Sequence, residues 1–461
     1  MRPSLVITAA LIAAAVIVGA GVLLLNPDRP LIVAAQFEAD VLTPNADGDG
    51  DVVLFAYELA RAAKIGITLE SDSGETYVFR NPQANPAGAY RIAFSGVVAG
   101  YLRPDEDILG TVERRLIPDG VYTWTLTAAA LQGDESLTAQ GTLTVRDSDV
   151  ALPLITDFTV SPRVFTPNQD GVGDLVYINV YLQKSADLTA YLIGAEGERV
   201  YIAPRQDIRQ EGEAGWQEFT YAGGIDIGAD PPPDGDYTVY VEAQDLEGQR
   251  IVVTSELTIA EGGKPRAGIL GQGSGADVIM TVQPYAAAYA STLETRGEAL
   301  PMPDNPEDLR ATSLVVPLGD MLVFRLTVEN YGSSPLRTTG PMPGTVYDQR
   351  QIAASLAEYE QDGAWRVGIQ CETSEQSYPW RWALGTPEQL TAVSDPTNDN
   401  VYYYLPPGTR SVVWGAVRLT DIVSTTNPQQ CWAGLIHEGV NVYNNRIGVR
   451  DVLIADTTQG N

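Results

Sequence analysis

Residues 41–51 read VLTPNADGDGD, and residues 164–174 read VFTPNQDGVGD. Each copy is followed by a run rich in apolar and β-branched residues, VVLFAY at 52–57 and LVYINVY at 175–181. A second pair of related phrases follows downstream, PDGVYT at 118–123 and PDGDYT at 233–238. Both pairs recur at about the length of one domain, roughly 100–150 residues. The repeat therefore predicts two tandem domains of the same fold, and the strand-like runs predict that they are β domains.

The composition is that of a folded, acidic protein. The chain has 461 residues, of which 44% are hydrophobic and 19% charged, enough apolar side chains for buried cores. Its net charge is -30, from 59 acidic and 29 basic residues. This charge disfavours binding to nucleic acid through phosphates and docking on anionic lipid headgroups. We expect no nucleic-acid partner.

The N-terminal region predicts a membrane anchor. The stretch from Leu5 to Leu25 contains no charged residue. At helical rise its length is about 31 Å, which spans the hydrocarbon core of a bilayer. We expect an uncleaved anchor that places the remainder of the chain outside the cytoplasm, at the cell surface. The alternative is a cleaved signal peptide, with a small-residue site at 33–35.

Turn residues and linkers divide the chain into four parts. We predict an all-β fold in which an N-terminal transmembrane helix is followed by three immunoglobulin-like β-sandwich domains in tandem. The only stretch after the anchor with a helical pattern is 352–359. The predicted parts are the anchor and a short stalk at 1–30, domain 1 at 31–149, domain 2 at 150–262, and a linker with the C-terminal sandwich at 263–461.

The two repeated phrases resemble a known module. A Thr-Pro-Asn-x-Asp-Gly turn before a strand, with a later Pro-Asp-Gly-x-Tyr before a closing hairpin, is similar to the immunoglobulin-like repeat of the flagellar hook-capping protein family. The resemblance covers about 31–259 and implies spacer or assembly modules without catalysis. The C-terminal domain resembles cell-adhesion-type sandwiches at 326–333 and 405–410, and an intracellular-proteinase-inhibitor-like sandwich has a similar opening.

The repeated Asn- and Asp-rich loops are candidate calcium sites. Oxygen ligands at alternate positions, with Gly permitting the turn, match the first half of an EF-hand loop. A full EF-hand is excluded because its twelfth position, Ala56, carries no carboxylate. The alternative is that Asx-turns and glycines form these loops without an ion. The candidate ligands of a structural calcium ion are Asn45, Asp47, Asp49 and Asp51 in the first loop and Asn168, Asp170 and Asp174 in the second.

The C-terminal domain holds the remaining candidate residues. In an exported protein the only two cysteines, Cys371 and Cys431, predict a disulfide. Trp380 and Trp382 lie on one face of an extended segment, and with Tyr403 they are candidates for stacking on a sugar ring or a partner surface. The alternative is that these aromatic side chains pack in the sandwich core.

The sequence gives no enzyme signature. The single histidine, His437, lies at an expected strand end and cannot form a metal-hydrolase cluster. We predict a non-enzymatic, membrane-anchored cell-envelope protein in which two spacer domains present a C-terminal binding domain to an envelope or surface protein or a glycan. The alternatives are a structural subunit of a surface assembly, or a secreted hydrolase with a carboxylate site in the C-terminal domain.

Overall fold

The computed structural model describes residues 29–104, 106–203, 212–271, 276–304, 312–395 and 400–456. The predicted anchor at 5–25 lies outside these residues, and within them no helix is long and apolar enough to cross a membrane. Strands dominate the described chain, so the all-β prediction is confirmed. The predicted helix at 352–359 is wrong: only a 3-10 turn forms at Ala353–Leu356, and it ends where Ala357 turns left-handed at φ 61°.

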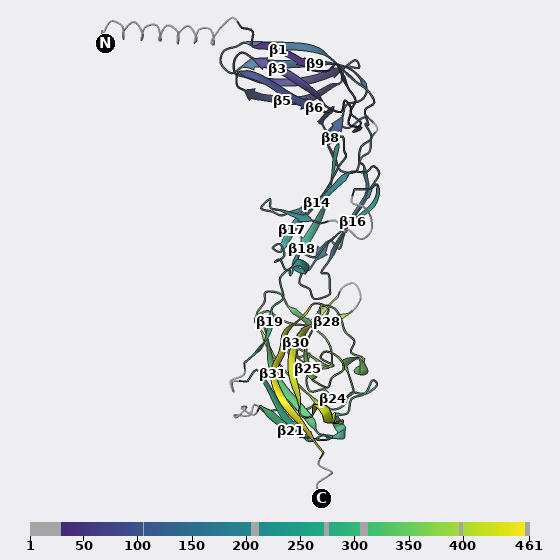
Figure 1. The fold of residues 1–461 in the computed structure, drawn as a ribbon, viewed down its shortest axis with the longest axis vertical. Helices are drawn as coiled ribbons and strands as arrows, with labels where there is room; N and C mark the ends of the chain where they lie inside the picture. The colour runs from purple at the N-terminus through teal and green to yellow at the C-terminus, as the bar shows by residue number, and fades with distance from the viewer. Residues whose placement is uncertain are drawn as a thin grey trace, which may run out of the picture.

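The first unit is a sandwich of two sheets (Figure 1), in which every strand pair is antiparallel except that of β2 with β10. Alternation places one row of side chains inward on each strand, as in β3, whose buried positions alternate with half-buried ones. Phe55 and Trp124 meet edge to face in this core with ring centroids 5.1 Å apart. The smaller sheet is β1 (Ile32–Phe37), β3 (Val53–Leu59) and β6 (Gly88–Phe94). The larger sheet is β2 (Val41–Leu42), β10 (Ser136–Val145), β9 (Gly120–Ala130), β4 (Ala63–Ser71) and β5 (Thr76–Asn85).

The second unit repeats this plan. In both units a two-residue strand after the entry pairs in parallel with the last long strand, β2 with β10 and β12 with β18. The smaller sheet is β11 (Ile155–Ser161), β13 (Val176–Leu182) and β16 (Gly215–Tyr221). The larger is β15 (Arg199–Ile202), β14 (Asp187–Ile193), β17 (Gly235–Gln244) and β18 (Arg250–Ile259), with β12 (Val164–Phe165) beside β18.

The repeated phrases form the same turns in both units. One carboxylate closes each opening loop: Asp51 accepts three backbone N–H groups at 2.7–3.1 Å, and Asp174 accepts three at 2.6–3.3 Å. In the closing phrase, the Tyr122 hydroxyl donates to the carbonyl of Pro118 at 2.7 Å, and Tyr237 does the same to Pro233 at 2.8 Å. Each phrase is therefore a turn in which the side chains form hydrogen bonds with backbone groups of the same phrase.

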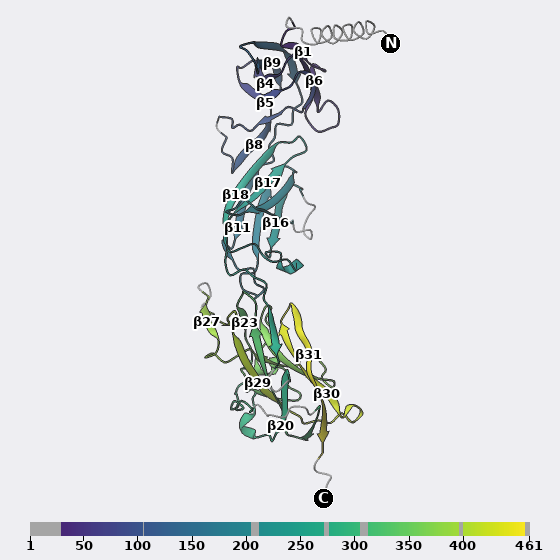
Figure 2. The ribbon, with the colours of Figure 1, turned by 90° about the vertical axis from the view of Figure 1, so that its left-hand side faces the viewer.

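An arm from the first unit joins the sheet of the second. The strands β7 (Val97–Ala99) and β8 (Thr111–Leu116) extend the larger sheet beyond β18, with Ile251 opposite Val112. The sequence analysis did not predict this pairing between units. Gln249 also bridges the two units: its side-chain amide donates to the carbonyls of Asp149 and Ala151 at 3.0 and 2.8 Å. Strand pairing between the units restrains this junction, and Figure 2 shows the units arranged end to end.

The third unit is a larger sandwich of two sheets around the biggest core of the described chain. One sheet contains β19 (Ala267–Leu270), β22 (Met321–Asn330), β29 (Arg410–Arg418) and β24 (Val346–Asp348), with β20 (Val278–Gln283) beside β22. The other contains β21 (Ser313–Pro317), β31 (Asn441–Ala455), β30 (Gln429–His437), β25 (Trp365–Cys371), β23 (Leu336–Thr338), β28 (Val401–Leu405) and β27 (Thr391–Ser394), with β26 (Trp380–Ala383) beside β25.

The second Asp loop is the contact between the second and third units. The Arg337 guanidinium donates to the main-chain carbonyl of Asp170, and the Tyr404 hydroxyl donates to its carboxylate at 3.0 Å. The Nε2 of His437 lies 2.6 Å from the carbonyl of Gln169, and a carbonyl only accepts, so Nε2 carries the proton. The corresponding tip of the first loop is exposed. The repeated loop has therefore become a docking element in one of its two copies.

Gly171→Ala is expected to open this contact. A Cβ at Gly171 would lie 2.1 Å from the carbonyl oxygen of Asp362 in the third unit, at φ +81°. The matched control is Gly48→Ala, which has a similar φ of +93° but no atom within 4 Å of the added Cβ. Both changes carry the left-handed strain of about 1–2 kcal/mol. Only Gly171→Ala should accelerate amide hydrogen exchange at 336–338 and 361–363. Equal exchange in the two variants would contradict the docking role.

Candidate functional site

Three loops meet at the end of the third unit that faces away from the second. The strand β25 starts at Trp365, which pairs with His437 beside the second unit, and ends at Cys371 on the far side. Residues that follow β24 and β29 line one cavity together with residues that follow β25, so all three loops lie at this distal end. In Figures 1 and 2 it is the end farthest from the first unit, where the described chain also terminates.

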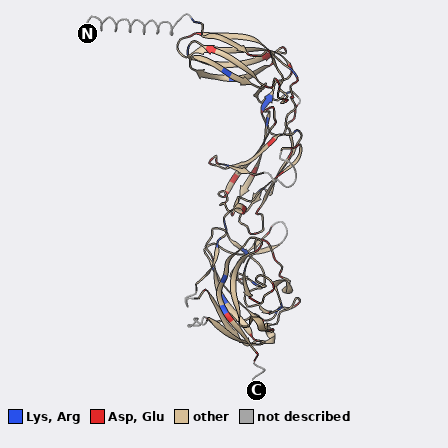
Figure 3. Ribbon diagram, in the orientation of Figure 1, with Lys and Arg blue, Asp and Glu red and all other residues tan. Residues whose placement is uncertain are grey.

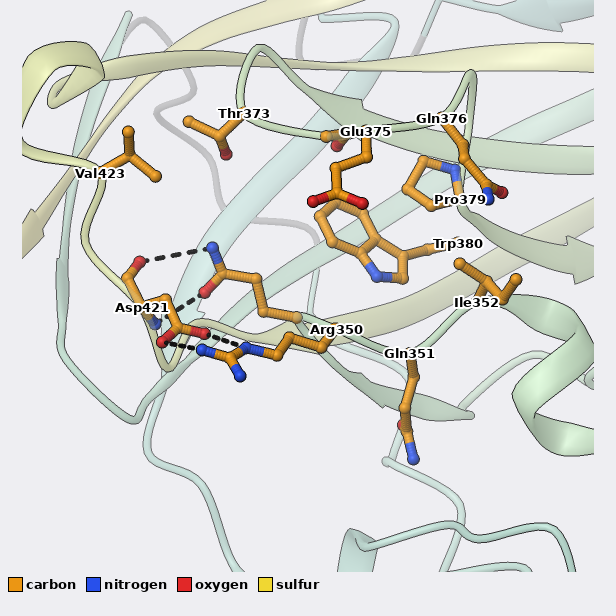
Figure 4. Close-up of a pocket in the computed structure, with 12 residues that line it drawn as sticks. Arg350, Gln351, Ile352, Thr373, Glu375, Gln376, Pro379, Trp380, Asp421 and Val423 are labelled. Carbon is orange, nitrogen blue, oxygen red and sulfur yellow. Dashed lines mark hydrogen bonds and ion pairs between the residues drawn. The ribbon is translucent and has the colours of Figure 1, made fainter.

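These loops enclose a cavity of about 500 Å³. Ligand pockets fall in the range of about 300–1,000 Å³, so the volume suits a small ligand or a segment of a larger one. Figure 4 shows Glu375, Trp380, Arg350 and Asp421 around a common space, whereas the side chain of Gln351 points away from it. The lining residues are Gln349, Arg350, Gln351, Ile352, Thr373, Ser374, Glu375, Gln376, Pro379, Trp380, Asp421 and Val423.

Hydrogen bonds hold the walls of the cavity in place. The carbonyl of the Gln349 side chain accepts from the backbone N–H groups of Thr420 and Asp421 at 2.8 and 2.9 Å, which ties two of the loops together. The third loop leaves a disulfide between Cys371 and Cys431, which lie opposite each other on β25 and β30. Its first turn is closed by the Ser374 hydroxyl, which accepts the Cys371 N–H at 3.1 Å.

The charges of the cavity are largely balanced. Arg350 donates twice to Asp421, at 3.0 and 2.9 Å, and this pairing lowers the pKa of the Asp421 carboxyl (Figure 4). Glu375 is exposed, and among the described residues it has no ion pair. The cavity thus offers one carboxylate as a free hydrogen-bond acceptor.

The structure separates the aromatic residues singled out from the sequence. Trp380 is 3% exposed and lines the cavity, and its indole N–H is buried without a hydrogen-bond partner among the described residues. Trp382 is fully buried in the core, where its N–H donates to the Thr345 carbonyl at 2.9 Å. Tyr403 is half-buried on β28, toward the second unit. Neither indole presents an exposed ring face for stacking.

The sequence analysis did not anticipate Arg350, Glu375 and Asp421 as lining residues. They come from three loops that are far apart in the chain and show no shared spacing. The only sequence signal near them is the cysteine pair, because a disulfide fixes the base of the loop at 372–379.

The Asp-rich loops lie at the two ends of the second unit. The first contacts the linker, where the Asp149 N–H donates to the Pro44 carbonyl at 3.1 Å, and the second docks against the third unit. Within the described residues, no group of three or more His, Cys, Asp or Glu side chains forms a metal-binding cluster. Calcium at either loop stays a prediction.

Calcium binding at the first loop is tested by thermal unfolding of the full chain. We expect the midpoint to rise in millimolar calcium, to fall back with chelator, and to lose this response when Asp47 and Asp49 are both changed to Asn. A midpoint that is insensitive to calcium would show that the loops are turns only.

The one histidine has a structural role in the unit contact. His437 is 1% exposed and stacks on Trp365 with ring centroids 4.4 Å apart, remote from the distal cavity. Burial lowers the pKa of His437 to about 4, because the imidazolium would lose its hydration. Burial likewise raises the pKa of the nearby Asp170 carboxyl to about 6, with the Asp174 charge adding to the effect.

These two groups predict opposite pH dependences of folding stability. A histidine pKa lowered from 6.5 makes the folded state lose stability as pH falls from about 6.5 toward 4. A carboxyl pKa raised from 3.8 makes it lose stability as pH rises from about 4 through 6. For each group the free energy of unfolding changes by at most about 1.4 kcal/mol per pH unit.

Unfolding in urea at several pH values separates the two contributions. We expect His437→Gln to reduce the loss of stability on acidification, and Asp170→Asn to make that loss steeper. A difference between wild type and variant that stays constant with pH would contradict the assignment for that group.

No protein-family model and no curated protein matches the chain. Matches to solved structures include the following three. A tetra-tandem repeat from the extending region of a large adhesion protein is 11% identical, with 92% of this chain and 74% of that chain covered and a TM-score of 0.16. A 1.5-MDa bacterial ice-binding adhesin is 12% identical, with coverage of 85% and 99% and a TM-score of 0.18.

A two-domain fibronectin type III segment from chicken tenascin is 12% identical, with 49% of this chain and 97% of that chain covered and a TM-score of 0.15. The resemblance of the repeated phrases to hook-capping modules stays a prediction.

Proposed function

We propose that this chain is a non-enzymatic, membrane-anchored extracytoplasmic protein whose distal cavity binds an envelope or surface partner. The observation that carries the proposal is the position of the cavity, at the end of a row of three units whose other end follows the predicted anchor. A site at that position has the greatest reach from the membrane.

The two junctions support a spacer role for the first two units. The first junction is a shared sheet, reinforced by Lys184, which lies 2.8–2.9 Å from carboxylate oxygens of Asp149, Asp245 and Glu247. The second is the docked Asp loop. Units joined in this way keep a fixed direction, which a flexible linker would not provide.

The charge supports a surface location away from lipid. The net charge of -30 repels anionic headgroups, and Figure 3 shows Lys and Arg positions scattered along the described part of the chain. An acidic surface keeps such a protein soluble and standing off the membrane.

The proposal is tested with the full chain in liposomes, to which isolated envelopes of the source cells are added. Gln376→Trp, at an exposed position in the lining, should fill the cavity and abolish retention of the envelopes. Gln132→Trp, at an exposed loop of the first unit, should leave retention unchanged. Retention by the Gln376→Trp variant at the wild-type level would refute the cavity as the binding site.

A second candidate function, a subunit of a surface assembly, is favoured by the strand β27. It lies at the edge of its sheet, and all four of its residues are exposed. An exposed edge presents unpaired backbone groups to which another chain can add a strand. Concentration-dependent growth of the purified chain into larger species would support this function over the first.

A further inference from the structure

A second cavity adjoins the distal cavity. It has a volume of about 330 Å³ and shares the side chains of Ile352, Gln376 and Pro379 with its neighbour. The wall between them is held by the N–H of Ala353, which donates to the carbonyl of Pro379 at 3.3 Å. Two cavities with common lining residues lie side by side, which suits a chain-like ligand that extends across both.

The arginines around the two cavities are already paired. Arg381 contacts Glu360 at 2.6 Å and Glu438 at 2.9 Å, as Arg350 contacts Asp421 in the first cavity. Among the described residues Glu375 is the lining carboxylate without an ion pair. An anionic ligand would therefore find no free cation here and would meet the negative charge of the chain.

The remaining polar groups suit hydroxyls. The carboxylate of Glu375 accepts hydrogen bonds, while the side-chain amide of Gln376 both donates and accepts. At the second cavity Tyr359 is 64% exposed, so its ring face is open to an apolar surface such as that of a sugar ring. Loops supply most of the lining, whereas an extended peptide is commonly held along a free strand edge.

We infer that the two adjoining cavities form one site for an uncharged linear oligosaccharide, with sugar units in both. This inference rests on the proposed function and specifies its ligand. In the first cavity the carboxylate of Glu375 accepts hydrogen bonds from sugar hydroxyl groups. In the second cavity the ring of Tyr359 packs against a sugar ring.

Calorimetric titration of the full chain in nanodiscs tests the inference. The probes are cellohexaose, chitohexaose, xylohexaose, mannohexaose and maltohexaose, each with its disaccharide. At least one hexasaccharide should bind about tenfold more tightly than its disaccharide, because only the longer chain reaches both cavities. Glu375→Gln and Tyr359→Ala should each lower the affinity for that hexasaccharide by about fivefold.

Tyr331→Ala is the matched control, since Tyr331 is 60% exposed in the same unit but lines neither cavity. Its affinity should equal that of the wild type. An unchanged affinity of Tyr359→Ala, or equal affinities for hexasaccharide and disaccharide, would overturn the two-cavity site. The ligand class would be overturned if none of the five hexasaccharides binds. It would also be overturned if an uncharged hexapeptide binds and the hexasaccharides do not.

The two failures are distinguishable. If no hexasaccharide binds but Gln376→Trp still abolishes envelope retention, the oligosaccharide inference falls and the proposed function stands. If the Gln376→Trp variant retains envelopes at the wild-type level, both the proposed function and the inferred ligand are contradicted.

Discussion

Glu438→Ala is expected to destabilise the third unit by about 3–5 kcal/mol. The side chains of Arg366 and Glu438 are 0% and 2% exposed and lie 3.1 Å apart. Glu438 also accepts from Arg381 at 2.9 Å and from the backbone N–H of Gln361 at 2.7 Å. Its removal would leave the Arg366 guanidinium charged, buried and without its counter-ion, the costliest way to break such a pair.

Urea unfolding followed by tryptophan fluorescence measures this effect, because most of the seven tryptophans lie in the third unit. The control is Glu360→Ala, which also removes a partner of Arg381 but at a side chain that is 74% exposed. An exposed pair contributes about 0–1 kcal/mol, so this variant should unfold near the wild-type midpoint. Equal losses in the two variants would contradict the role of burial.

A double replacement gives an independent check on the cause. Arg366→Met combined with Glu438→Leu removes both charges and leaves apolar side chains in their place. We expect this variant to be more stable than Glu438→Ala, since paired removal leaves no isolated buried charge. If the double variant is less stable than Glu438→Ala, the loss arises from packing and not from the unpaired guanidinium.

The parts of the fold that the sequence predicted are those whose contacts are local. The Asp51 and Asp174 turns and the Tyr122 and Tyr237 contacts join residues at most six positions apart. Both partners of each contact lie within the short phrase itself, so the repeat was enough to predict two similar units. The runs at 52–57 and 175–181 in the same way located the strands β3 and β13.

The parts that it could not predict depend on distant partners. Arg337 and Asp170 are 167 residues apart, and His437 and Gln169 are 268 apart. Nothing in the loop at 164–174 distinguishes it from its exposed counterpart at 41–51 as a docking element. The arm formed by β7 and β8 was hidden for the same reason, because its partner strand β18 belongs to the next unit.

The distal cavity shows the same limit. Its lining comes from loops after three different strands, and loop residues follow no period that marks which of them converge. Trp380 and Trp382 were grouped because both point to one face of an extended segment. The structure places the second in the core, where Tyr347 meets it edge to face at 5.0 Å.

Replacing Cys371 and Cys431 together with alanine is expected to cost about 2–5 kcal/mol, since the bridge closes a loop across a sequence separation of 60 residues. Both cysteines are buried in the core, at 1% and 0% exposure, and the loop at 372–379 leaves directly from this bridge. The variant should therefore lose affinity at the distal cavity as well as stability.

Thermal unfolding and titration with the best-bound hexasaccharide, each with and without dithiothreitol, measure the two effects. Reduction of the wild-type chain should shift its midpoint toward that of the double alanine variant, while Glu375→Gln should weaken binding without moving the midpoint, because Glu375 is exposed. A wild-type midpoint that reductant leaves unchanged, together with an equally stable double variant, would show that strand pairing between β25 and β30 alone holds the loop. A shift in both measurements would make the cavity dependent on an oxidising compartment, which the proposed extracytoplasmic location would supply.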